Sequence, residues 1–495
     1  MTSLFRNASW GAIAAGVRLF FGMANLFLAI KLVGSANYGY FALIVSFTTF
    51  YVTLVNSVHT IAVTHAVDYR GTPDEKEKLG LLFSSVFIIT LAAVFILVLL
   101  IGLFGHGFIE NFIYRGNDLD EQLMLKSLLL ITLYIAVFQL LTGSNVAVVE
   151  SLGRFDNAAR MQMYGPVLIF VLLAHGYVEL GQLTILEVAK FIAIGSVCDF
   201  IFTGFVRVRM KYIGSFVPNK RAVELFPVLF RDGLSLQGAR LVNVFFDPFN
   251  KYLLNRFVGS VAVTNYEIAM KIVSGIQGLF GGAFRTFLQL TERMSFDGSN
   301  DYIKTIKYGL TPALIIHGIG GISIVAITRL WISSDLSHLT MFYLSLVPAS
   351  LVIIFIAPIY YALIGVRDVN FIFRMNFNLA CLNILGSAIF IPIFGIYGAS
   401  IGFTIAIAHN AILEYKRYII KVGPVTGLNK ALISIKYNIL TGSLICFISL
   451  ICGEYVKSMF FLILLESVLF LMLLMLLLRE PLTKKVASKF ILFKK

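Results

Sequence analysis

Long apolar segments alternate with short polar ones along almost the whole chain. Windows of about 19 residues predict membrane-spanning helices at these segments. The first six fall near residues 9–33, 39–64, 79–103, 124–149, 158–177 and 184–206. Because a helix needs roughly 20 apolar residues to cross a bilayer, each segment is long enough to span one.

After a polar and basic stretch the apolar pattern resumes. Six more segments fall near 228–257, 260–287, 305–330, 340–364, 372–392 and 395–420, and a last pair near 434–453 and 457–478. The pattern predicts an all-α polytopic membrane protein with about 14 transmembrane helices. The predicted parts are an N-lobe (1–206), a cytoplasmic basic linker (207–227), a C-lobe (228–420), an extra helix pair (434–478) and a basic cytoplasmic tail (479–495).

Composition and charge agree with this class of protein. Of 495 residues, 58% are hydrophobic and 13% charged, whereas soluble proteins carry roughly 25% charged residues. The net charge of +14 could suggest a nucleic-acid partner, but most lysines and arginines lie between apolar segments. Because cationic loops stay in the cytoplasm, we interpret the surplus as a topology signal. It places both termini in the cytoplasm and predicts no nucleic-acid partner.

An internal repeat relates the two halves of the chain. At a constant offset of 222, the first predicted span matches the seventh, and Asn25 is aligned with Asp247. The identical positions are Gly11, Gly16, Arg18 and Leu19 with Gly233, Gly238, Arg240 and Leu241, and after a three-residue slip Val33-Gly34-Ser35 matches Val258-Gly259-Ser260. Six spans separate the copies, so both cross the membrane in the same direction. The repeat therefore predicts two six-helix lobes in a parallel pseudo-twofold arrangement, which is typical of transporters.

Charged residues inside the predicted spans are the main candidates for function. A charge at the bilayer centre costs roughly 2.5 to 3.5 kcal/mol, so we expect each to face a partner or a watery cavity. The predicted substrate-binding cations are Arg18, Arg240, Lys251 and Lys271, the carboxylates that could couple an ion are Asp247 and Glu267, and the supporting polar residues are Asn25, Asn243 and Tyr266.

Two interpretations of these charges stay open. Four cations against two carboxylates predict a net cationic cavity, which suits a phosphate or pyrophosphate that arginine can bind in bidentate fashion. Alternatively, Arg240 with Asp247 and Lys271 with Glu267 neutralise each other and only hold helices together.

Other candidate chemistry is weak. The four cysteines lie in apolar segments without metal or redox spacing, and the chain lacks the G-x4-G-K-[ST] phosphate-binding loop. For His59, His317 and His409, each inside a predicted span, we expect local hydrogen bonds rather than a proton relay. No metal and no cofactor are expected.

Several motifs resemble those of bacterial polysaccharide flippases of the O-antigen (Wzx) type, in the multidrug/oligosaccharidyl-lipid/polysaccharide (MOP) exporter superfamily. They are Asn7 to Gly11, Leu32 to Tyr40, Gly153 to Phe155, Phe246 to Pro248, Tyr266 to Ala269 and Phe394 to Ala399. The resemblance implies a MATE-like, V-shaped, two-lobed fold in the bacterial inner membrane. The last helix pair departs from the twelve-helix members, as in the lipid II flippases.

The resemblance also implies a function. Members translocate an undecaprenyl-pyrophosphate-linked oligosaccharide from the cytoplasmic to the periplasmic leaflet, and cationic residues of a central cavity engage the cargo. The implied partners are this lipid-linked oligosaccharide, membrane lipids, H⁺ or Na⁺ as coupling ion, and polysaccharide polymerase and chain-length regulator proteins.

Two other functions make different predictions. A cation-coupled multidrug exporter of the same fold predicts an acidic or aromatic cavity instead of a basic one. A membrane-embedded polysaccharide polymerase or ligase predicts a sizeable periplasmic loop, and the longest outer connection, 104–123, is too short for a domain. We therefore expect a transporter and not an enzyme.

Overall fold

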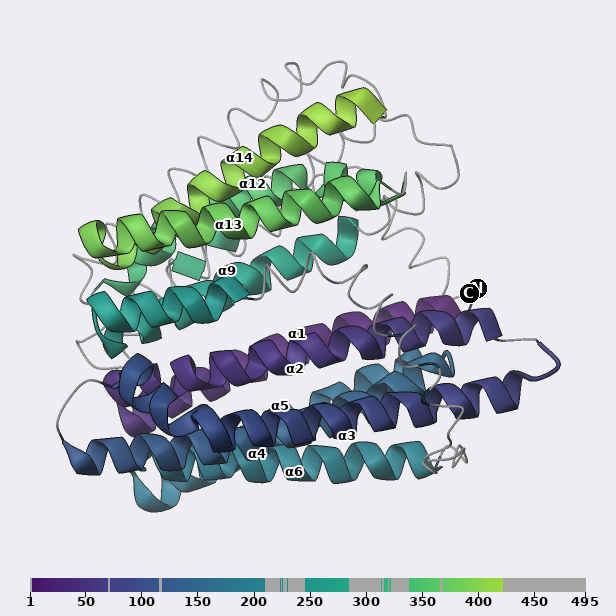
Figure 1. The fold of residues 1–495 in the computed structure, drawn as a ribbon, viewed down its shortest axis with the longest axis horizontal. Helices are drawn as coiled ribbons and strands as arrows, with labels where there is room; N and C mark the ends of the chain where they lie inside the picture. Colours follow the sequence, from purple (N-terminus) through teal and green to yellow (C-terminus); the bar gives the residue numbers. More distant parts are fainter. Residues whose placement is uncertain are drawn as a thin grey trace, which may run out of the picture. The chain divides into compact units, whose positions relative to one another are not determined.

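The computed structural model describes residues 2–69, 72–114, 118–209, 245–284, 338–365 and 368–421, together with a few single positions between them. All regular structure in these ranges is helical (Figure 1). The helices are α1 (Thr2–Val33), α2 (Ser35–Tyr69), α3 (Glu75–Phe108) with a π-helical turn η1 (Ile109–Ile113), α4 (Leu119–Ser151), α5 (Phe155–Leu180), α6 (Ile185–Arg209), a segment over 245–257, α9 (Ser260–Phe284), α12 (Leu339–Gly365), α13 (Val369–Phe394) and α14 (Ile396–Lys421).

Eight of the described helices are long and apolar enough to cross a membrane. They are Gly16–Val33, Ser35–Val63, Glu75–Ile113, Leu119–Ser151, Phe155–Leu180, Leu339–Leu363, Asn370–Phe394 and Ile396–Lys421. The predicted all-α, multi-pass fold is confirmed. The count of about 14 stays a prediction, because the segments near 434–453 and 457–478 lie outside the described residues, as does most of 305–330.

The helix bounds follow the apolar pattern closely where both are known. The segment predicted near 184–206 is α6, Ile185–Arg209, and the one near 395–420 is α14, Ile396–Lys421. Other helices run past the apolar core, as α2 does from Ser35 to Tyr69. Inside lipid every backbone N–H and C=O must form a hydrogen bond within the helix. The same helical hydrogen bonds continue into the polar residues at each end, which makes the helices longer than the apolar segments.

The chain divides into two compact units, Met1–Thr264 and Asn265–Lys495. In the first unit α1 packs along α5, α2 along α4 and α4 along α6. A core that includes Val52, Leu97 and Leu133 joins α2, α3 and α4. Many outward side chains of α3, such as Phe95 and Leu103, are exposed in the isolated chain. Such faces suit contact with lipid.

The first unit extends beyond the predicted N-lobe. Asn255 donates a hydrogen bond from Nδ2 to the carbonyl of Ile113 over 2.8 Å, and Thr264 Oγ1 donates to the carbonyl of Ser35 over 2.6 Å. These bonds attach the 245–257 helix and the first turn of α9 to the N-terminal helices. The lobe boundaries drawn from the repeat, 206 and 228, stay a prediction.

In the second unit α12, α13 and α14 pack together, and Ile276 of α9 joins the core beside Ile354 of α12. α13 and α14 cross at Gly386 and Gly402, where a Cβ on Gly386 would lie 2.8 Å from the Cα of Gly402. Small residues permit this close backbone approach between membrane helices.

Two of the three histidines make the local hydrogen bonds that were predicted. His59 Nε2 lies 2.9 Å from Thr90 Oγ1, and His317 Nε2 lies 2.9 Å from Ser350 Oγ. Both partners come from the same unit as the histidine. These contacts agree with a role in local packing.

One pair of turns supports the repeat. Gly34 has a φ of 81° and Gly259 a φ of 114°, a region that favours glycine. α2 begins at Ser35 and α9 at Ser260, directly after these two glycines. The matched sequence Val-Gly-Ser therefore makes the same sharp helix-to-helix turn in both copies.

Candidate substrate and ion sites

Lys251 and Asp247 form an ion pair within the 245–257 helix. The Nζ of Lys251 lies 2.8 Å from Asp247 Oδ2, and 5% of the lysine side chain is exposed against 35% of the aspartate. A buried ammonium is stable only when it is paired. The ion pair therefore compensates the buried charge of Lys251. Asp247 is the more accessible of the two side chains.

Lys271 and Glu267 form a second pair, on α9. The Nζ of Lys271 lies 3.1 Å from Glu267 Oε1, with 43% of the lysine and 14% of the glutamate side chain exposed. Here the cation is the accessible partner. The neighbouring Tyr266 is 2% exposed, and its ring packs against Phe342. Tyr266 is thus a packing residue.

Arg18 and Asn25 lie along α5. Arg18 donates from Nη1 to Gln162 Oε1, and from Nε to the carbonyl of Ala14 over 3.3 Å. Asn25 Nδ2 donates to the carbonyl of Pro166 over 2.9 Å. Arg18 and Asn25, two turns apart on α1, thus both direct their side chains towards α5.

Arg18 also interacts electrostatically with Glu150, at the end of α4. Sequence reasoning did not select Glu150. With Glu150 included, the described candidates hold three cations and three carboxylates, namely Arg18, Lys251 and Lys271 with Asp247, Glu267 and Glu150. The predicted surplus of positive charge therefore depends on Arg240, which lies outside the described residues together with Asn243.

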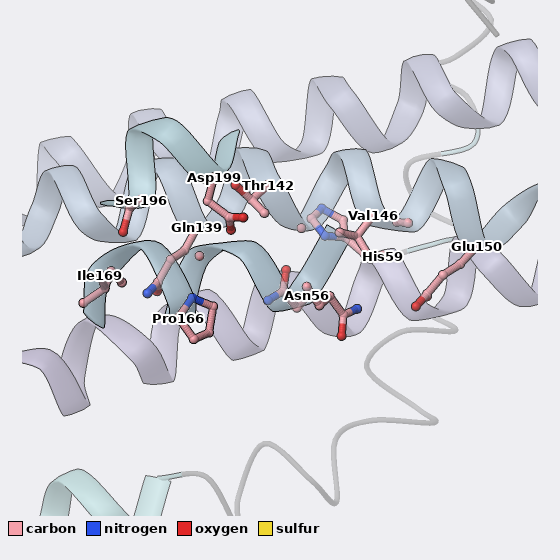
Figure 2. Close-up of a pocket in the computed structure, with 14 residues that line it drawn as sticks. Asn56, His59, Gln139, Thr142, Val146, Glu150, Pro166, Ile169, Ser196 and Asp199 are labelled. Carbon is pink, nitrogen blue, oxygen red and sulfur yellow. The ribbon is translucent and has the colours of Figure 1, made fainter. Parts of the chain in front are cut away.

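A cavity of about 370 Å³ with polar and apolar walls lies inside the first unit, between α2, α4, α5 and α6 (Figure 2). Its lining includes three titratable groups, His59, Glu150 and Asp199. The other polar lining residues are Asn56, Gln139, Thr142, Gln162 and Ser196. Since Gln162 is the residue that receives the Arg18 hydrogen bond, Arg18 stands beside this cavity.

His59, Glu150 and Asp199 were not selected as site residues from the sequence. Asp199 lies inside the segment predicted near 184–206, where a charged residue is a functional candidate by default. That signal was present in the sequence. The meeting of the three residues in one cavity was not, because they come from three helices far apart along the chain.

Comparison with known proteins identifies the family. A family model described as "Polysaccharide biosynthesis protein" matches residues 4–287, more than half of the chain. The chain belongs to the polysaccharide biosynthesis protein family. A search of curated proteins found no match.

Solved structures define the fold. A lipid II flippase MurJ in an inward closed conformation superposes with a TM-score of 0.69 at 15% identity, over 95% of this chain and 98% of that one. An inward-facing multidrug resistance MATE family transporter of the MOP superfamily gives 0.65 at 14% identity, over 84% and 99%. A mutant of the Vibrio cholerae MATE transporter VcmN gives 0.58 at 14% identity, over 88% and 97%. This family member has the MOP fold, as its motifs predicted, and the proteins it resembles are transporters rather than enzymes.

Proposed function

We propose that the protein is a flippase that moves an undecaprenyl-pyrophosphate-linked oligosaccharide from the cytoplasmic to the periplasmic leaflet. One observation carries the proposal: a member of the polysaccharide biosynthesis family has a fold similar, over 95% of its length, to that of a lipid II flippase. A membrane protein of a polysaccharide pathway with this fold suits a lipid-linked glycan as cargo.

In this proposal the cations bind the pyrophosphate. Lys271 has an accessible ammonium, with 43% of its side chain exposed, and Arg18 offers a planar guanidinium that suits phosphate oxygens. Arg240 and Lys251 complete the set. The lobes of the repeat rock against each other in alternating access, while the prenyl chain stays in lipid.

The carboxylates Asp247 and Glu267 are the proposed coupling groups for H⁺ or Na⁺. Each is bound to a lysine one turn later, so protonation of the carboxylate would release a cation for the pyrophosphate. The proposal places the protein in the bacterial inner membrane with both termini in the cytoplasm. A polymerase and a chain-length regulator would act on the product.

The direct test is reconstitution of the full chain in proteoliposomes with a fluorescent undecaprenyl-pyrophosphate glycolipid. We expect the label in the inner leaflet to become accessible to a membrane-impermeant quencher only when active protein is present. Arg18→Ala, Arg240→Ala and Lys271→Ala should each slow this exchange, and Arg240→Lys should retain part of it. Full rates in all three alanine variants, at equal protein content, would refute the role of the cations.

A multidrug exporter is the second candidate, because a MATE transporter superposes with a TM-score of 0.65. The described cavity of the first unit also favours it, since Glu150 and Asp199 but no lysine or arginine line that cavity. The same vesicles separate the two functions. Transport of a cationic dye along an H⁺ or Na⁺ gradient, without glycolipid exchange, would replace the flippase proposal by the exporter.

A further inference from the structure

The cavity of the first unit contains buried polar atoms that lack a hydrogen-bond partner. They are His59 Nδ1, Thr142 Oγ1 and Asp199 Oδ1, on α2, α4 and α6. A buried polar atom without a partner costs free energy. Three such atoms around one cavity point to a ligand that supplies the missing bonds.

The hydrogen bonding of His59 shows which kind of group is missing. Thr90 donates its hydroxyl proton to the carbonyl of Val86 over 2.7 Å, so its oxygen is left to accept from His59 Nε2 over 2.9 Å. In a neutral ring the proton then sits on Nε2, and Nδ1 is an acceptor. Asp199 Oδ1 is an acceptor as well. The cavity therefore offers acceptors to an O–H or N–H donor.

The size of the cavity narrows the class of ligand. A volume of about 370 Å³ is far larger than a bare ion or a single water needs. Among the described residues, no cluster of three or more His, Cys, Asp or Glu side chains could hold a metal ion. A single sugar ring fits this range.

The charge of the lining argues against phosphate. Neither lysine nor arginine is among the described lining residues, whereas Glu150 and Asp199 are. The remaining polar groups are the His59 imidazole, amides and hydroxyls, which exchange hydrogen bonds with neutral sugars. Gln162, whose Oε1 accepts from Arg18, keeps its amide donors for a ligand. Because Arg18 donates to Gln162, a guanidinium that can bind phosphate lies at the edge of the cavity.

We propose that this cavity binds one neutral sugar residue, a hexose or an N-acetylhexosamine, of the lipid-linked cargo. The inference rests on the proposed flippase function and deepens it. Arg18 and the other cations bind the pyrophosphate, and His59, Thr142 and Asp199 bind the sugar. The cavity thereby makes the protein selective for a glycosylated lipid over bare undecaprenyl pyrophosphate.

The test measures binding to the purified full chain by native mass spectrometry. The probes are undecaprenyl pyrophosphate alone and the same lipid carrying glucose, galactose, N-acetylglucosamine or N-acetylgalactosamine. We expect at least one glycolipid to bind about tenfold more tightly than the bare lipid, as two or three added hydrogen bonds allow. Thr142→Val and Asp199→Ala should reduce this ratio to about one and leave binding of the bare lipid unchanged.

A matched control is available on α4. Thr132 is buried there, and its hydroxyl donates to the carbonyl of Leu129 over 2.8 Å, so Thr132→Val makes the same change outside the cavity lining. It should keep the wild-type ratio. Because Thr142 Oγ1 has no protein partner, Thr142→Val should also melt at or above the wild-type temperature.

Each other outcome overturns a distinct claim. Equal binding of bare and glycosylated lipids by the wild type refutes the sugar site and leaves the flippase proposal standing. A ratio that survives Thr142→Val and Asp199→Ala places sugar recognition elsewhere and refutes the cavity. A thermal shift caused by Na⁺ that Asp199→Asn removes, with the ratio unchanged, makes the cavity an ion site. Failure to bind any of these lipids refutes the flippase proposal itself.

Discussion

The ammonium of Lys251 lies 2.8 Å from the carboxylate of Asp247, one turn earlier on the same helix, and the lysine is almost completely buried. Removing one partner of a buried ion pair leaves the other charge uncompensated, which costs more than removing both. The stability of this helix should therefore depend on the match between positions 247 and 251 rather than on either charge.

We predict that Asp247→Asn lowers stability by about 2 kcal/mol, less than the roughly 3–5 kcal/mol of a fully buried pair, because a third of Asp247 is exposed. The double variant Asp247→Asn with Lys251→Met should recover most of this loss. Thermal unfolding of the detergent-purified chain measures both. An Asp247→Asn protein as stable as the wild type would show that Lys251 does not depend on Asp247.

In the pair on α9 the accessible partner is the lysine, since 43% of the Lys271 and 14% of the Glu267 side chain are exposed. Lys271→Ala leaves a largely buried carboxylate without this partner, so it should lower the melting temperature, and adding Glu267→Gln should recover most of the loss. Lys271→Ala should also act on cargo, with glycolipid exchange reduced about fivefold to tenfold by the loss of one phosphate contact. Lys271→Arg is the charge-preserving control. A large loss of stability with normal exchange would make this pair structural.

Features that depend on neighbouring residues could be predicted from the sequence, whereas contacts between helices far apart along the chain could not. The span of α6 is set by local hydropathy and was found to within a few residues, and the Gly34 and Gly259 turns follow from a short matched motif. The meeting of His59 with Asp199 depends on how α2 packs against α4 and α6, which hydropathy does not encode. The Lys271–Glu267 pair was predicted from its spacing on one helix, whereas the Lys251–Asp247 pair was not predicted. Gln162, which accepts a hydrogen bond from Arg18, lies on a different helix and could not be inferred from local spacing.

An ion pair in the second unit can be tested by pH. Asp368, between α12 and α13, accepts a 2.7 Å hydrogen bond from Arg417 Nε, and this bond holds the pKa of Asp368 below its ordinary value of 3.8. A depressed pKa in the folded state stabilises the protein above the unfolded pKa, and the contribution is lost as pH falls through the folded value.

We therefore predict that Arg417→Gln destabilises the protein near pH ~6 and that the difference from wild type shrinks steadily below about pH 4. Unfolding by denaturant over this pH range measures it. Asp368→Asn should show the same loss at the higher pH without the pH dependence. A wild-type advantage that stays constant down to about pH 3 would mean that Arg417 stabilises the chain by another contact, such as its approach to the Phe371 ring.

Within the first unit, the backbone of α2 closely approaches the start of α9. A Cβ built on Gly39 would lie 1.9 Å from the carbonyl oxygen of Ser260, so no side chain fits unless the backbones separate. Gly39→Ala should lower the melting temperature by several degrees and slow glycolipid exchange, because the Thr264 to Ser35 bond beside it would also be strained.

Gly22→Ala is the matched control for this prediction, since its Cβ would meet no atom within 4 Å. Alanine there should stabilise α1 by up to about 1 kcal/mol through its higher helix propensity. The two variants add the same methyl group to a helical glycine, so the difference between their melting temperatures measures the contact at Ser260. Equal melting temperatures would show that α2 and the first turn of α9 separate at this point without cost.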